Sequence, residues 1–170
     1  MKAIIYIIFL FSGVVLLASC EKKDYRMGLP EYDNHYYAAY IPNNNSVVSV
    51  QRTQTDLLKL SVQFYSAFTR SYDAVAWYAA DTTGISNPAI LGEDFNIVDK
   101  NGNVIQPDNS GAYTITFPKA ERKMDTIYIK LLNNPVPGTR RVEIKIRDHQ
   151  TDQYDVDIFS TAYRRPVDIK

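Results

Sequence analysis

Hydrophobic residues recur at every second position along most of this chain, and no other feature restricts its fold as strongly. The clearest case is the segment 141–147, where Val142, Ile144 and Ile146 alternate with charged side chains. Successive side chains of a strand point to opposite faces, so this spacing predicts β-strands with one buried face. The same spacing occurs at residues 58–65, 127–131 and 154–159, and more weakly at 36–41, 47–52, 75–79, 95–98 and 113–117.

Turn-forming residues separate these segments. After residue 19, no stretch keeps an apolar face at helical spacing for three turns. Runs of Asn, Asp, Gly and Pro lie at 42–45, 99–103, 107–111 and 133–138. The 13 Tyr, 7 Phe and one Trp also suit half-buried pleated surfaces. We therefore predict an all-β chain that forms an antiparallel immunoglobulin-like β-sandwich of about 7–9 strands.

The first part of the chain differs in character from the rest. Residues 3–19 carry no charged side chain and follow the basic Lys2, which is the layout of a secretory signal. About 17 apolar residues also reach the lower limit for spanning a bilayer, so a retained transmembrane helix is the alternative. Residues 21–35 are polar and aperiodic. We predict a signal peptide at 1–19, a lipidated cysteine and flexible tether at 20–35, and one β-sandwich domain at 36–170.

The segment Leu17-Ala18-Ser19-Cys20 resembles the lipobox of bacterial lipoproteins. This resemblance implies that Cys20 is acylated, becomes the first residue of the mature chain and anchors it to a membrane, which two or three acyl chains do stably. Cys20 is the sole cysteine, so a disulfide or a Cys-based metal site is not expected. The charged residues 21–24 resemble a sorting signal that sends lipoproteins to the outer membrane. This resemblance implies that the protein is anchored there and faces the cell exterior.

Three short motifs resemble Calx-β-like and related immunoglobulin-like domains. They are the turn Gly92-Glu93-Asp94-Phe95, the strand ending in Phe117-Pro118 and the alternating strand at 126–131. With the lipobox, they make the chain similar to small surface lipoproteins of Bacteroidetes, many of which accompany starch-utilisation-type transporter and binding-protein pairs. The resemblance spans about residues 36–160. It implies an outer-membrane transporter or binding-protein complex as a partner.

Two departures from that family limit what the resemblance implies. Lys119-Ala120 follows the Phe-Pro where family members often have Ala-Gly, and Asn133-Asn134-Pro135 replaces the acidic spacing that binds calcium in true Calx-β domains. Calcium binding is therefore not implied.

The sequence displays no grouping typical of catalysis or metal binding. Its histidines, His35 and His149, are isolated, and the series that begins at Asp99 lacks the Gly and Glu of a calcium loop. We interpret that series as a hairpin turn, and the carboxylates of Glu93, Asp94 and residues 155–157 as surface charge. We expect no enzyme and no cofactor. With 19 basic and 19 acidic residues and no run of five or more like charges, we also expect no nucleic-acid partner.

Aromatic residues provide the remaining candidates. Period two buries one of Trp77 and Tyr78 and exposes the other, and a buried Trp is common in sandwich cores. We therefore assign Trp77 to the core and propose Tyr37, Tyr72 and Tyr78 as ligand-binding residues.

Two functions are consistent with these features. The first is a non-catalytic surface lipoprotein that binds glycan or assists a nutrient-uptake complex. The alternative is a structural or adhesive lipoprotein that binds proteins, for which edge-strand pairing is one mode. A flat aromatic strip flanked by Asn and Asp favours the first, and a long uncovered edge strand favours the second.

Overall fold

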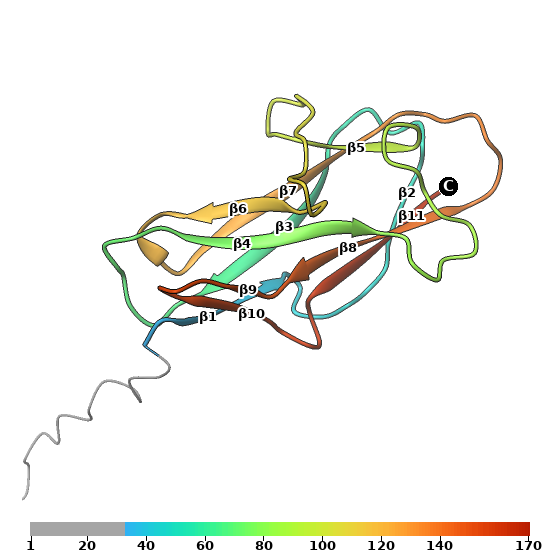
Figure 1. Cartoon of the computed structure of the whole chain (residues 1–170). Helices are drawn as coiled ribbons and strands as arrows, with labels where there is room; N and C mark the ends of the chain where they lie inside the picture. Colours follow the sequence, from blue (N-terminus) through green and yellow to red (C-terminus); the bar gives the residue numbers. More distant parts are fainter. Residues whose placement is uncertain (1–32) are drawn as a thin grey trace, which may run out of the picture. The chain divides into compact units, whose positions relative to one another are not determined.

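Two β-sheets pack face to face in the computed structural model, which describes residues 33–170 (Figure 1). All the strands lie in the unit Asn34–Lys170. The predicted signal peptide, Cys20 and most of the predicted tether fall at 1–32, outside the described residues.

One sheet has six strands in the order β5-β7-β3-β1-β10-β9, and the other has five in the order β2-β11-β8-β4-β6. The strands are β1 (His35–Tyr40), β2 (Val48–Val50), β3 (Leu58–Tyr65), β4 (Ala74–Asp81), β5 (Phe95–Val98), β6 (Tyr113–Phe117), β7 (Lys123–Leu131), β8 (Arg140–Arg147), β9 (His149–Gln150), β10 (Asp155–Ile158) and β11 (Arg164–Ile169). Most pairs are antiparallel, whereas β1 with β10 and β11 with β2 are parallel.

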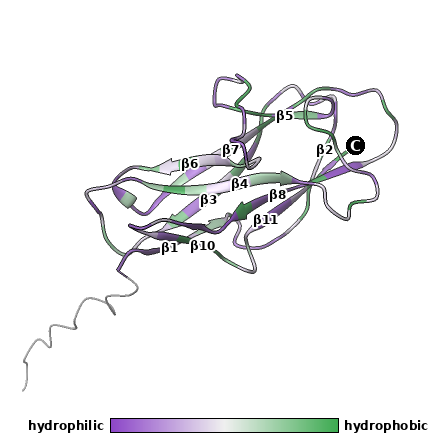
Figure 2. Ribbon diagram, viewed as in Figure 1, coloured by the Kyte–Doolittle hydropathy of each residue, from purple (hydrophilic) through white to green (hydrophobic). Residues whose placement is uncertain are grey.

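The core lies between the inner faces of the two sheets. Phe64 of β3 stacks on Phe117 of β6, with ring centroids 4.4 Å apart, so the two sheets touch through these rings. In β8 the buried residues are Val142, Ile144 and Ile146, as the period-two pattern predicts. The colours in Figure 2 show the same interleaving of hydrophobic and hydrophilic residues along the strands. Burial of alternate apolar side chains is therefore what holds the sandwich together.

The predicted all-β sandwich is confirmed, although there are more strands than expected. Each segment with period-two spacing forms a strand, and β9 and β11 are additional. β11 was missed because Arg165 and Pro166 interrupt its apolar pattern. Pro166 is tolerated because β2 pairs with β11 only from Val167 onward, so no partner on that side needs the missing N–H.

Candidate binding surfaces

A polar groove of about 540 Å³ crosses the outer face of the five-stranded sheet. The side chains of β8 and β11 that point away from the core form its floor, and the loop after β4 forms a wall. Hydroxyl and amide groups from the loop (Thr83, Ser86 and Asn87) meet charged side chains from the strands (Arg141, Glu143, Lys145, Arg164 and Asp168). Ile85 is its single aliphatic lining residue, so the groove suits a polar ligand.

Backbone and side-chain hydrogen bonds fix the loop wall to β8. The amide of Asn87 donates to the Thr139 carbonyl at 2.5 Å, and the Arg141 N–H donates to the Asn87 carbonyl at 3.0 Å. At the other end of the loop, the Thr83 N–H donates to the Asp81 carboxylate at 2.8 Å. The wall is thus tied down at both ends, which fixes the shape of the groove.

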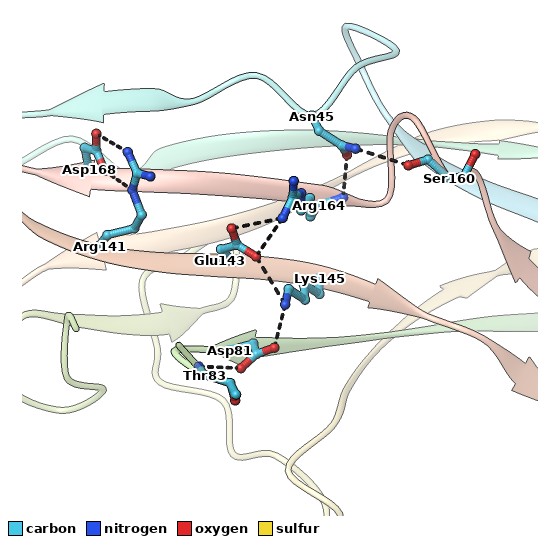
Figure 3. Close-up of polar contacts among 9 residues, drawn as sticks. All are labelled: Asn45, Asp81, Thr83, Arg141, Glu143, Lys145, Ser160, Arg164 and Asp168. Atoms are coloured by element: carbon cyan, nitrogen blue, oxygen red, sulfur yellow. Dashed lines mark hydrogen bonds and ion pairs between the residues drawn. The ribbon is translucent and has the colours of Figure 1, made fainter. Parts of the chain in front are cut away.

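Ion pairs join the charged side chains of the floor in two separate groups, one of which extends to Asp81 of β4 (Figure 3). The Arg141 guanidinium donates two hydrogen bonds to Asp168, at 2.6 and 2.8 Å. The Lys145 ammonium lies 2.7 Å from the Asp81 carboxylate and 3.1 Å from that of Glu143. Arg164 lies 3.4 Å from the other oxygen of Glu143. Positive and negative groups therefore alternate across the floor and largely neutralise one another.

These pairs fix the protonation states of the groups involved. Hydrogen bonds from Lys145 and the Thr83 backbone hold the pKa of Asp81 well below its usual range. Those from Arg141 lower the pKa of Asp168, and the same bonds raise the pKa of Arg141. Hydrogen bonding to Asp81 raises the pKa of Lys145. A general acid or base must titrate near the working pH, so the shifts of these four groups do not suit them to move a proton.

A second surface lies on the outer face of the six-stranded sheet, on the opposite side of the sandwich. Here Tyr37 of β1 is paired with Tyr65 of β3, and Phe159 follows β10. The Phe159 ring lies 6.0 Å from that of Tyr37, edge to face, and 6.4 Å from that of Tyr65. Tyr37 is 38% exposed and Phe159 is 42% exposed. Two exposed aromatic side chains and the half-buried Tyr65 thus form a cluster on this face.

Two further side chains extend this cluster across β7. The Arg122 guanidinium lies 5.5 Å from the centre of the Tyr65 ring, and Met124 is 55% exposed. Met124 is paired with Gln63, whose side chain lies on the same face of β3 as that of Tyr65. We call Tyr37, Tyr65, Arg122, Met124 and Phe159 the aromatic face. Its rings are tilted or perpendicular to one another rather than coplanar, so it is not a flat strip.

A third surface is the border of the five-stranded sheet. β6 pairs with β4 on one side, and no other strand among residues 33–170 pairs with its second side (Figure 1). A groove of about 370 Å³, lined by residues that include Thr114, Ile115 and Thr116, runs beside this edge. The borders formed by β2 and β9 have only three and two residues.

Of the three tyrosines proposed from the sequence, only Tyr37 lies on an open surface. Tyr78 is 3% exposed and belongs to the core, so its assignment to a binding surface is wrong. Trp77 lies on the outer face instead, where it stacks on His149 with centroids 4.3 Å apart. The alternating pattern correctly placed Trp77 and Tyr78 on opposite faces of β4. It could not tell which of these faces the second sheet covers.

Tyr72 is half-buried and packs against the core. Its ring stacks on Tyr154, with centroids 5.5 Å apart, and its hydroxyl donates to Asn34 and accepts from Tyr36. Burial and the hydrogen bond with Tyr36 raise the pKa of Tyr72 to about 12. The structure therefore does not bring Tyr72 together with Tyr37 in one binding surface.

Two interpretations of acidic residues have different outcomes. Asp99 accepts hydrogen bonds from the N–H groups of Asn101 and Asn103, so the hairpin turn is confirmed. Asp94 is not surface charge: it is 2% exposed and lies 2.7 Å from the Arg140 guanidinium. It also accepts the Ile90 N–H, which explains why an Asp is needed in that turn.

The described residues 33–170 also lack two kinds of feature. They hold no group of three or more His, Cys, Asp or Glu side chains placed to bind a metal ion. No helix in this part of the chain is long and apolar enough to cross a membrane.

Sequence reasoning missed the groove and most of the aromatic face. The charged residues of β8 were recognised, but as the solvated side of a strand, since their pairing with β11 and β4 depends on topology. Tyr65 and Phe159 come together only because β1 lies between β3 and β10, and Arg122 joins them because β7 pairs with β3. The available clue was an aromatic residue at the end of one strand, Tyr65, and another just after the end of a second, Phe159.

Solved structures with a similar fold include two Calx domains and a cohesin. The apo-form Calx CBD1 domain is 13% identical, with a TM-score of 0.49 over 78% of this chain and 95% of that one. The Calx CBD2 domain is 10% identical, with a TM-score of 0.49 over 79% and 86%. A type III cohesin module from the ScaE cell-surface anchoring scaffoldin of Ruminococcus flavefaciens is 6% identical, with a TM-score of 0.44 over 80% and 87%. No family model and no curated protein matches the chain.

Proposed function

We propose that this chain is a lipid-anchored, non-catalytic domain that binds a protein partner through its aromatic face. The observation that carries the proposal is the composition of that face: the exposed side chains of Tyr37, Phe159, Met124 and Arg122 lie around the half-buried Tyr65. Aromatic residues, Met and Arg are the types enriched at protein interfaces, where aromatic and Arg anchors supply most of the binding energy.

The non-catalytic part of the proposal rests on the ion pairs of the polar groove. The acids Asp81, Glu143 and Asp168 each lie against a basic side chain. Each of these three acids is thus held as the partner of a base and is not free to act as the acid in hydrolysis of a glycosidic bond.

The anchor is part of the same proposal and rests on the segment that ends at Cys20. Acylation of Cys20 holds the domain at the outer membrane, facing outward, where a partner in a membrane complex is within reach of the tether. Replacing Cys20 by alanine should release the chain from the membrane fraction and abolish incorporation of a labelled fatty acid. Retention and labelling without Cys20 would contradict the anchor but not the binding face.

Site-specific crosslinking in cells tests the binding face. A photoreactive benzoyl-phenylalanine at position 159 should give a discrete crosslinked band, and Tyr37→Ser with Tyr65→Ser should remove it. The matched control is the same group at position 136, since Val136 is equally open at 46% exposure but lies outside the aromatic face. Equal crosslinking from both positions, or none from position 159, would rule the proposal out.

A glycan ligand in the polar groove is a second candidate function. It is favoured by the alternating donors and acceptors of the floor, because neutral sugar hydroxyls both donate and accept hydrogen bonds. Calorimetric titration with a polysaccharide panel should then show binding that Asn87→Ala weakens at least tenfold. Heat signals that Asn87→Ala leaves unchanged, or none with any polysaccharide, would remove this candidate. A role for this chain in nutrient uptake belongs to this second candidate function and not to the first.

A further inference from the structure

The free edge of β6 has a sequence that is complementary to itself. From Tyr113 to Phe117 it reads aromatic, Thr, Ile, Thr, aromatic. When two such strands run antiparallel about Ile115, Thr114 lies opposite Thr116, and Tyr113 opposite Phe117. Thr–Thr and aromatic pairs are favourable across neighbouring strands.

The edge also lacks the features by which proteins protect exposed strands. Charged side chains, proline, bulges or a covering segment usually prevent pairing with another chain. β6 has no charged residue and no proline, and Thr114 and Thr116 are exposed. By contrast, the outer side of β5 is closed by the chain that follows it, where Val98 bridges to Val104 and the Ile105 N–H donates to the Ile97 carbonyl.

The open side of the sandwich leaves room next to this edge. The 370 Å³ groove beside Thr114, Ile115 and Thr116 is bounded on the far side by β7, with Asp125, Thr126 and Tyr128, and by Asp99 and Lys100 after β5. Farther along, Tyr113 lines a second hollow of about 250 Å³. A strand added to β6 would cover both hollows and satisfy the backbone groups along the free edge.

We propose that β6 of one chain pairs antiparallel with β6 of a second copy. The two five-stranded sheets then form one continuous sheet related by a two-fold axis, an arrangement in which the same patch serves both copies. Five residues a side make a small interface, so the dimer is weak. Tethering both copies to one membrane, as proposed above, raises their effective concentration and favours the pair.

Sedimentation velocity on residues 21–170 tests this pairing without any partner. We expect a concentration-dependent shift from monomer to dimer between about 10 µM and 1 mM, the range for a small interface. Thr114→Lys with Thr116→Lys should leave only monomer, since each new lysine faces another across the two-fold axis. Thr69→Lys with Thr139→Lys adds the same charge at exposed positions elsewhere and should leave the dimer intact.

A charge-complementary variant tests the register. Thr114→Lys with Thr116→Glu places a lysine opposite a glutamate in both symmetry-related pairs, so dimerisation should return. Thermal unfolding checks that each variant is folded. A wild-type chain that stays monomeric at about 1 mM, or a dimer that survives the double lysine variant, would overturn the proposal. Neither result bears on the aromatic face, which lies on the other sheet.

Discussion

The Arg165 guanidinium lies 5.0 Å from the centre of the Tyr40 ring, inside the sandwich. Arg165 is 2% exposed and Tyr40 is fully buried, and no carboxylate among the described residues 33–170 pairs with the charge. Instead the guanidinium donates to the Pro42 carbonyl, the Asn44 side chain and Ser46. Burial lowers the pKa of Arg165. Neutral acceptors and a ring face thus hold the loop between β1 and β2 onto β11.

Arg165→Met should therefore destabilise the domain by about 2–4 kcal/mol, because the loop loses all its hydrogen bonds to the buried guanidinium. Arg165→Lys should lose most of the same free energy, since an ammonium cannot reach all these acceptors at once. Urea unfolding measures both. Arg141→Met, in a pair whose guanidinium side chain is 42% exposed, is the control and should cost about 1 kcal/mol or less. Equal losses at both positions would contradict the structural role of Arg165.

The buried pair of Asp94 and Arg140 should be strongly coupled. Asp94→Ala leaves a buried guanidinium without its partner and should cost about 3–5 kcal/mol. Combining it with Arg140→Met should cost less than the sum of the single changes, since neither charge is then left alone. A double-mutant cycle by urea unfolding measures the coupling, and strictly additive losses would show that the pair contributes nothing jointly.

Acid should destabilise the domain partly through Asp81. Its pKa is lowered on folding, so its contribution is present above the unfolded pKa of about 3.9 and is lost as the pH falls through the folded value. Asp81→Asn should lower stability at pH 7 and reduce the loss between about pH 4 and pH 2. Unfolding curves across this range measure it, with Asp152→Asn in an exposed turn as control. An unchanged pH profile would argue against the Lys145 pair.

The two faces of β4 should differ in their tolerance of truncation. Tyr78→Ala removes a core ring and should cost about 3–5 kcal/mol. Trp77→Ala removes a half-buried ring stacked on His149 and should cost clearly less, although Trp is the larger residue. Thermal unfolding ranks the two. The reverse order would restore the assignment of Trp77 to the core.

The strands were predictable from sequence to the extent that their own residues alternate. In the segments that form β3, β5, β6, β7 and β8, the alternation of apolar residues predicts which side chains are buried. Turn residues mark the ends of these segments. β11 carries no such mark. Arg165 is buried through contacts with a loop about 120 residues earlier in the chain, and Pro166 is tolerated because the short strand β2 pairs with β11 only beyond it.

The binding surfaces were less predictable because they depend on which strands become neighbours. Tyr37 was selected as a spare aromatic residue, yet its partner Phe159 is contributed by a parallel strand pair that period two does not specify. Tyr78 failed for a related reason: alternation divides a strand into two faces, and only the position of the second sheet decides which one is inside.

Binding of the crosslinked partner to variants of the aromatic face tests the central claim most directly. With the partner isolated through position 159, calorimetric titration should show that Tyr37→Ser with Phe159→Ser weakens binding at least about 100-fold, as loss of two anchors predicts. Asn87→Ala in the polar groove and Thr114→Lys with Thr116→Lys at the β6 edge should each change the affinity less than about threefold. Full affinity in the aromatic double variant, or a comparable loss in either control, would contradict the account.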